Sequence, residues 1–249
     1  MSLGKEVKKK FIEHYNKEAE FYDEYRYSNP CQNFYSELQK EIVYSYLRGC
    51  SYVYEAGCGT GRFAIHLAKQ GIKVLAMDSS KKMLKIARDK AKREGVSAMV
   101  KFEHGDIENI KHKNNSFDGV LSVAVLRHFP DIDKSIAELS RILKPGGVLV
   151  TDFLDKKIFL FYDIYKKIFG DWKKEEHFFK NYYRTLEEVK YVLERNGITL
   201  VEHKAIVKFP SHPLLCKLFD FEFFSSALKF YEDSINIGGV VTTKGIKKM

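Results

Sequence analysis

Three glycines at alternate positions mark the part of this sequence best suited to hold a ligand. A β-prone run at residues 52–54 leads into Glu-Ala-Gly-Cys-Gly-Thr-Gly at residues 55–61, and apolar residues then recur at helical spacing. This order predicts a strand, a tight turn and a helix. Glycine allows positive φ and a close approach of the backbone to a ligand, and the first N–H groups of a helix lack partners within it. The segment therefore predicts a nucleotide-type ligand at the turn.

The spacing of these glycines argues against two common nucleotide sites. The dinucleotide fingerprint is G-x-G-x-x-G, whereas Gly57, Gly59 and Gly61 alternate with other residues, and Glu55 stands two positions before the first of them. A phosphate-binding P-loop would need G-K-[ST], which does not follow. We therefore expect neither NAD nor a P-loop ligand.

A further acid stands at a distance that suits a ribose. Residues 73–78 predict a second strand, and it ends at Asp78, 21 positions after Gly57. A carboxylate at this place can accept hydrogen bonds from both ribose hydroxyls. The alternative is that Asp78 caps the next helix together with Ser79 and Ser80. We favour the ribose role.

Four motifs in this order resemble the class I S-adenosylmethionine-dependent methyltransferases, in particular the methyltransferase type 11 and ubiquinone/menaquinone-like group. They are the glycine segment, Asp78, Gly105-Asp106 after the third strand, and Leu-Lys-Pro-Gly-Gly at residues 143–147 before the fifth. The resemblance covers residues 15–155 and weakens after that. It implies a doubly wound, Rossmann-like α/β domain that binds S-adenosylmethionine, with a mainly parallel seven-stranded sheet whose last strand, residues 239–247, runs antiparallel.

The resemblance also implies which residues hold the cofactor. The acid matching Asp106 accepts from the adenine amino group while its neighbour packs on the ring, and the tyrosine matching Tyr22 lies near the methionine end. For Tyr22, packing of the helices onto the sheet is an equal alternative. Asp118, which leads the fourth strand, is expected to be structural. The predicted cofactor residues are Tyr22, Glu55, Ala56, Gly57, Cys58, Gly59, Gly61, Asp78, Ser79, Met83, Asp106, Ile107 and Val123.

Methyltransferases differ at the end of the fourth strand, where the acceptor is held. This chain lacks both the [DNS]-P-P-[YF] loop of amino-group methylases and a Pro-Cys pair there, and residues 122–129 resemble the small-molecule group. His128 is a candidate general base, although a packed, hydrogen-bonded histidine is the favoured alternative. Arg127 would suit an acidic substrate, and surface exposure is its alternative. A dedicated catalytic residue is not required, because the cofactor carries an activated methyl group and the protein positions it.

Two aromatic segments flank the predicted core of a single domain, residues 1–249. Residues 8–47 predict a helical cap that, by the resemblance, folds over the cofactor. Residues 154–183 predict a lid insertion over the substrate site, with Tyr162, Tyr165 and Trp172 as candidate substrate contacts. Packing in a homodimer is the competing use of this aromatic stripe.

Composition limits the partners. The net charge is +9, and its densest patch is a predicted helix over residues 81–93, whose opposite side is apolar. A solvated helix face explains this patch better than an RNA site does. No apolar run is long enough to span a bilayer, so we expect a cytoplasmic protein. The four cysteines show no metal spacing, and Cys58 is expected to be a small residue that fits the turn.

The sequence thus predicts an S-adenosylmethionine-dependent methyltransferase that acts on a small molecule with an apolar or aromatic part. An RNA (tRNA or rRNA) methyltransferase is the second choice because of the charge. A non-catalytic S-adenosylmethionine-binding protein is the third.

Overall fold

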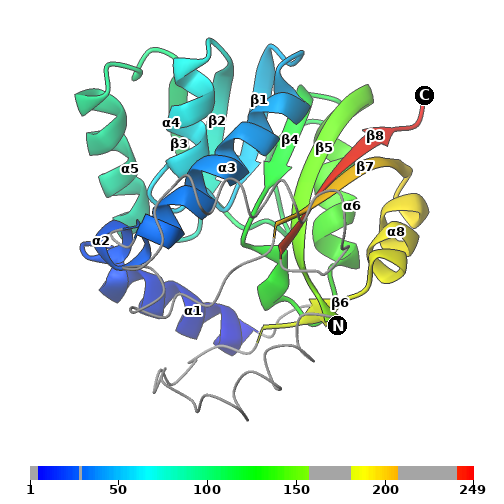
Figure 1. Ribbon diagram of the computed structural model, residues 1–249, viewed down its shortest axis with the longest axis horizontal. Helices are drawn as coiled ribbons and strands as arrows, with labels where there is room; N and C mark the ends of the chain where they lie inside the picture. Colours follow the sequence, from blue (N-terminus) through cyan, green and yellow to red (C-terminus); the bar gives the residue numbers. More distant parts are fainter. Residues whose placement is uncertain (1–4, 28–29, 157–180, 207–239) are drawn as a thin grey trace.

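The chain forms an α/β fold, seen here in a computed structural model that describes residues 5–27, 30–156, 181–206 and 240–249 (Figure 1). Its strands are β1 (Tyr52–Ala56), β2 (Lys73–Asp78), β3 (Val100–His104), β4 (Phe117–Ser122), β5 (Leu143–Asp155), β6 (Tyr183–Arg184), β7 (Ile198–Ile206) and β8 (Val240–Lys247). Its helices are α1 (Lys5–Glu18), α2 (Tyr22–Tyr27), α3 (Pro30–Leu47), α4 (Arg62–Lys69), α5 (Lys81–Arg93), the short 3₁₀ turn η1 (Leu126–His128), α6 (Asp133–Ile142) and α8 (Leu186–Arg195).

The sheet has the order β3-β2-β1-β4-β5-β8-β7, and β6 pairs with β5. Strands β1 to β5 run parallel, whereas β8 is antiparallel to both of its neighbours. The predicted mainly parallel seven-stranded sheet with an antiparallel last strand is confirmed, and the two-residue β6 is an addition to it. The predicted substrate contacts Tyr162, Tyr165 and Trp172, and most of the predicted lid, lie outside the described residues.

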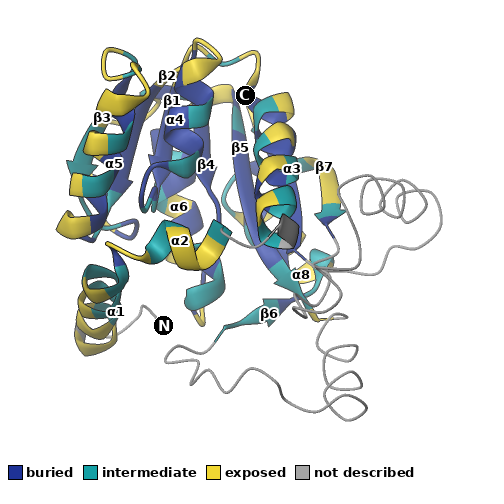
Figure 2. Cartoon of the chain, turned by 60° about the vertical axis from the view of Figure 1, so that its left-hand side comes forward, coloured by how far each residue is buried: buried dark blue, intermediate teal, exposed yellow. Residues whose placement is uncertain are grey.

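Helices cover both faces of the sheet, which is why its central strands carry apolar residues on both sides. Val53 and Tyr54, neighbours in β1, are both buried but belong to different core clusters. The cluster around Val53 includes side chains of α3, α4 and α5, and the cluster around Tyr54 includes side chains of α6 and α8. The central strands β1, β2 and β4 are accordingly mostly buried, whereas β3 and β7 at the sheet edges are more exposed (Figure 2).

Local sequence signals set several element boundaries. Thr185 and Glu188 form a capping box at the start of α8, the pattern that a threonine followed three residues later by a glutamate favours. Ser80 caps α5 by accepting a hydrogen bond from the Met83 N–H. One prediction is corrected: residues 143–147 do not precede the fifth strand but belong to it, because Leu143 already pairs with Phe117 of β4.

Asp118 has the structural role that the sequence predicted. Its Oδ1 accepts a hydrogen bond from the Tyr52 N–H at 2.8 Å and its Oδ2 accepts one from the Ser51 N–H at 3.1 Å. It therefore joins the beginning of β4 to the beginning of β1, at the amino end of the sheet. Among the described residues, no helix is long and apolar enough to cross a membrane.

We predict that Asp118→Ala lowers the free energy of unfolding by about 1–2 kcal/mol, because two backbone N–H groups lose a charged acceptor. Chemical denaturation measures this loss. Affinity for S-adenosylhomocysteine should stay at the wild-type value, and a loss of affinity in a folded variant would contradict the purely structural role.

Candidate functional site

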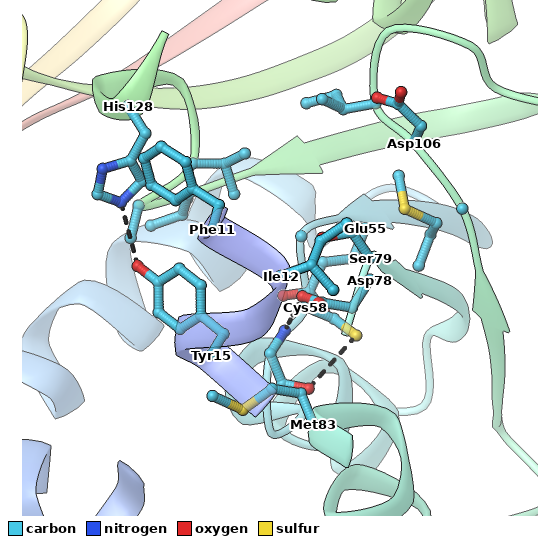
Figure 3. Close-up of a pocket in the computed structure, with 18 of the residues that line it drawn as sticks. Phe11, Ile12, Tyr15, Glu55, Cys58, Asp78, Ser79, Met83, Asp106 and His128 are labelled. Atoms are coloured by element: carbon cyan, nitrogen blue, oxygen red, sulfur yellow. Dashed lines mark hydrogen bonds between the residues drawn. The ribbon is translucent and has the colours of Figure 1, made fainter. Parts of the chain in front are cut away.

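A cavity of about 490 Å³ lies at the carboxyl ends of the parallel strands. Its walls come from the segments that follow β1, β2, β3 and β4, and from α1, which crosses these strand ends (Figures 1 and 3). The strand order reverses between β1 and β4, and open α/β sheets bind their ligands at this kind of switch point. The fold therefore places the cavity where the glycine turn was expected to hold a ligand.

Most of the predicted cofactor residues are brought together around this cavity. Ala56 and Gly61 are the exceptions: Ala56 is buried within β1, and Gly61 packs beside Ala87 at the start of α4. The predicted cofactor residues that line the cavity are Tyr22, Glu55, Gly57, Cys58, Gly59, Asp78, Ser79, Met83, Asp106, Ile107 and Val123.

The glycine turn is shaped by close contacts that side chains would prevent. The N–H groups of Gly57 and Cys58 donate to the Met77 carbonyl at 2.7 and 2.9 Å, which presses the turn onto the end of β2. A Cβ at Gly57 would lie 2.2 Å from Cγ2 of Val125. A Cβ at Gly59 would meet no described atom within 4 Å, although this residue lines the cavity. Gly57 is thus required for packing, whereas Gly59 leaves room for a ligand.

Asp78 ties the glycine turn to the start of α5. Its Oδ2 accepts from the Gly59 N–H and its Oδ1 accepts from the Ser80 N–H, both at 2.8 Å. Burial raises the pKa of Asp78, and these backbone donors act in the opposite direction. Since Ser80 itself caps α5, Asp78 is not needed as that cap. Its carboxylate faces the cavity with lone pairs left to accept from a ligand.

Asp106 has a partner that the sequence did not indicate. Lys8 of α1 donates to Asp106 Oδ2 at 2.7 Å and also contacts Glu108. Burial lowers the pKa of Lys8, but the hydrogen bonds to these two acids outweigh it, so the pKa is raised overall. No local pattern distinguishes Lys8 from the seven other lysines and glutamates of α1, because its partner Asp106 is 98 residues away.

Aromatic side chains of α1 form the opposite wall. Phe11 and Tyr15 point into the cavity beside Ile12 (Figure 3). The Tyr15 hydroxyl lies 3.3 Å from Nε2 of His128, and the Phe11 ring centroid lies 5.2 Å from that of the imidazole. In the structure, α1 is therefore a part of the N-terminal segment that lies over the site.

His128 lines the cavity in a neutral form. Burial lowers its pKa to about 3, and the positive charges of Arg127 and Arg26 act in the same direction. Its Nδ1 is buried without a hydrogen-bond partner in the described part of the chain. An imidazole with so low a pKa is a weak proton acceptor, so this environment favours the packed, hydrogen-bonded histidine over a general base.

Arg127 does not line the cavity, contrary to the prediction that it faces an acidic substrate. Its side chain is 17% exposed, and its Nη2 donates to the buried carboxylate of Asp152 at 2.5 Å. The surface-exposed alternative fails for the same reason. The charge of Arg127 is matched within the protein.

A known family accounts for the core of this arrangement. Residues 54–151 match the family model described as "Methyltransferase domain". Methyltransferase GfsG of Streptomyces halstedii is 36% identical over 98 residues, which are 39% of this chain and 35% of that protein. A demethylmenaquinone methyltransferase of Bacteroides fragilis is 34% identical over 100 residues, 39% of this chain and 41% of that protein. The chain carries a class I methyltransferase domain.

The solved structures agree on the fold. Magnesium protoporphyrin IX methyltransferase of Synechocystis PCC 6803, solved with bound S-adenosylhomocysteine, superposes with a TM-score of 0.63 at 17% identity. The superposition covers 88% of this chain and 86% of that one. The match to the curated relatives, by contrast, spans well under half of their length.

S-adenosylmethionine, the methyl donor of this family, fits the residues that line the cavity of the methyltransferase domain. The molecule carries an ammonium, a sulfonium, a ribose and an adenine amino group, all of which call for acceptors. Asp78 and Asp106 supply two carboxylates, and Gly59 leaves space. Glu55 is buried, and its Oε2 has no hydrogen-bond partner among the described residues. An orphaned acidic oxygen in the wall suits a cationic ligand.

Cys58 is not a nucleophile in this site. Burial raises the pKa of its thiol well above the usual value, and the nearby acids Asp78 and Glu55 raise it further. The thiol is neutral, as expected for a small residue that fits the turn.

We predict that binding of S-adenosylmethionine releases a proton from Glu55. Burial raises the pKa of Glu55 to about 8, so the ligand-free carboxyl is protonated at pH 7, whereas a bound cation favours its ionised form. The affinity should therefore rise with pH up to about 8. Calorimetry at pH 7 in buffers of different ionisation enthalpy measures the released proton, and Glu55→Gln should abolish it. Equal proton release in both proteins would show that another group is responsible.

We also predict that two glycines with the same backbone constraint respond differently to alanine. Gly59 has φ +54° and faces the cavity; Gly71 has φ +84° and follows α4, where a Cβ also meets no described atom within 4 Å. Each substitution should destabilise the fold by about 1–2 kcal/mol, because alanine is strained at positive φ.

Only Gly59→Ala should also weaken binding of S-adenosylhomocysteine, by about tenfold or more, because its methyl group enters the ligand space. Isothermal calorimetry compares the two variants. An equal effect on affinity would mean that Gly59 acts through stability alone.

Proposed function

We propose that this protein transfers a methyl group from S-adenosylmethionine to a small molecule with an apolar or aromatic part. The observation that carries the proposal is a single cavity with two unlike walls. The acidic residues Glu55, Asp78 and Asp106 come from the strand ends, and the aromatic residues Phe11 and Tyr15 come from α1. One wall suits the donor and the other suits an apolar acceptor beside it.

The residues of the chain bind the donor and the acceptor, orient them and exclude water from the site. When bound, S-adenosylmethionine supplies a methyl group activated by a sulfonium. Helix α1 covers the cavity, which keeps water from the reacting groups. His128 stays neutral, and its Nε2 lies 3.3 Å from the Tyr15 hydroxyl, so it helps to hold the Tyr15 ring in the aromatic wall. Placement of the two molecules in line is sufficient for this chemistry, so no residue needs to be assigned as the base.

Two of the relatives support a flat, apolar acceptor. They are named for demethylmenaquinone and for magnesium protoporphyrin IX, which are both extended ring systems. The aromatic wall of the cavity in this chain has the surface that such a ring would pack against.

The basic surface of α5 lies away from the cavity. Lys82, Lys85 and Lys92 are exposed on the outer side of this helix, whereas Met83 on its inner side lines the cavity. An RNA substrate held by these lysines would have to reach around the helix to the methyl donor. The +9 charge favours RNA as the second candidate, and the two can be separated by their response to salt.

The test is transfer of labelled methyl groups from S-adenosylmethionine into small-molecule and RNA fractions of a cell extract, at 50 and 200 mM salt. An acceptor in the small-molecule fraction, with a rate that changes little with salt, is expected. A protein that neutralises six or more phosphates would lose about a thousandfold in affinity over this range. Labelling of RNA with that salt dependence would overturn the proposal, and binding without transfer to either fraction would favour a non-catalytic role.

We predict that the aromatic wall, and not the basic helix face, controls transfer. Phe11→Ala should lower kcat/KM for the acceptor about tenfold, because a ring that packs on the substrate is lost. Phe21→Ala is the matched control, since Phe21 belongs to the same cap but is 65% exposed. Reversal of Lys82, Lys85 and Lys92 to Glu should leave kcat/KM within about twofold of wild type. The opposite pattern would indicate that the acceptor is held by charge.

A further inference from the structure

The structure contains a buried carboxylate next to the cavity that none of the cofactor motifs explains. Asp152, near the end of β5, is 1% exposed. Its Oδ1 accepts from the Ala124 N–H at 2.7 Å, and its Oδ2 accepts from Arg127 Nη2 at 2.5 Å. Ala124 follows β4 and Arg127 lies in η1, 28 and 25 residues before Asp152 in the chain. A buried ion pair of this kind is a costly feature that a well-packed apolar pair could replace.

The hydrogen bond to Ala124 holds an unfavourable backbone conformation. Ala124 has φ +64°, in the left-handed region that a residue with a Cβ rarely adopts. Such a conformation persists only where the surroundings impose it. The Asp152 carboxylate is the acceptor that fixes the Ala124 N–H in this orientation.

This conformation shapes the cavity. Residues 123–125, called here the 123–125 turn, all line it. Cγ2 of Val125 lies 2.2 Å from the place that a Cβ would take at Gly57, so the turn packs directly on the glycine loop. A rotation of Ala124 back to negative φ would move this contact and with it one wall of the donor site.

The other end of the segment is held separately. Arg184, 8% exposed, donates to the carbonyls of Leu126 and Phe129 at the two ends of η1. These contacts hold the part of the segment that carries His128. The 123–125 turn is held by the hydrogen bond from Ala124 to Asp152. The effect of Asp152 on the turn can therefore be tested in variants that share the loss of its contact with Arg127 in η1.

We propose that Asp152 is a positioning residue of the methyl-transfer site. It holds the 123–125 turn in the left-handed shape that completes the wall beside the glycine loop, and Arg127 serves as its counter-charge rather than as a substrate ligand. The role in methyl transfer rests on the function proposed above. The shaping of the donor site does not, and it can be measured by binding alone.

The experiment uses two double variants that both remove the ion pair. In Asp152→Asn/Arg127→Met, the Asn oxygen still accepts from the Ala124 N–H; in Asp152→Leu/Arg127→Met, a side chain of similar volume cannot. Both should fold, since replacing a buried ion pair by neutral residues is often tolerated. The first variant should bind S-adenosylhomocysteine within about threefold of the wild-type affinity. The second should bind it about tenfold more weakly than wild type, because the buried hydrogen bond that holds the Ala124 N–H is lost.

Two further measurements separate positioning from general destabilisation. Hydrogen exchange of the Ala124 amide, followed by NMR, should be fast only in the Leu variant. Adding Ala124→Gly to that variant should restore most of the affinity, because glycine adopts positive φ without strain. Thr151→Val is the control: Thr151 is the buried neighbour of Asp152, but its hydroxyl pairs with Thr243 and does not reach the cavity.

Equal affinities of the Asn and Leu variants, absence of rescue by Ala124→Gly, or the same loss in Thr151→Val would each overturn the proposal. These readouts need no methyl acceptor. A negative result in them is therefore distinct from a failure to find methyl transfer, which would contradict only the proposed function.

Discussion

The arrangement of the site depends on how the carboxylates at one edge of a parallel sheet are satisfied. Parallel strands bring their carboxyl ends together, and here they place Glu55, Asp78 and Asp106 around one cavity. Burial penalises each negative charge, so each must find donors or hold a proton. Asp78 accepts hydrogen bonds from two backbone N–H groups, and Asp106 accepts one from Lys8. Glu55 has an oxygen without a hydrogen-bond partner among the described residues. The least satisfied acid is the one from which a cationic ligand gains most.

The same constraint explains why the first helix packs across the site. Lys8 of α1 neutralises Asp106, and Asn16 of α1 accepts from the Ser80 hydroxyl at the start of α5. These contacts hold α1 at the acidic edge, and its aromatic residues then close the opposite side against His128. If Asp106 binds an adenine amino group, Lys8 and the ligand share one carboxylate. A carboxylate has two oxygens and several lone pairs, and Glu108 gives Lys8 a second partner, so both can be accommodated.

Features encoded in short stretches of sequence could be predicted, and those that depend on distant partners could not. The glycine turn, Asp78 and the capping box of α8 follow from residues within one strand, turn and helix, where backbone preference decides the outcome. Lys8 and Asp152 carry no such signal, because each is defined by a contact with a segment remote in sequence. The surroundings of Arg127 could not be predicted for the same reason: the sequence left an acidic substrate and an exposed surface as alternatives, and only the tertiary fold brings Asp152 against it.

The pairing of Arg127 with Asp152 also bears on the polarity of the acceptor wall. With that pair neutral overall and His128 uncharged, the part of this wall formed by Phe11, Tyr15 and His128 carries hydrogen-bonding groups but no net charge. The acids that match a positively charged donor are on the opposite wall. In a region of low polarity, the attraction between those acids and a cation is stronger than it would be in water. A cationic donor would therefore be drawn toward the acidic wall with its charge matched there, while the uncharged wall leaves the acceptor free of competing ions. This division of charge requires no residue to take up a proton, and it depends on the pairing of Asp152 with Arg127 as well as on the acids that line the cavity.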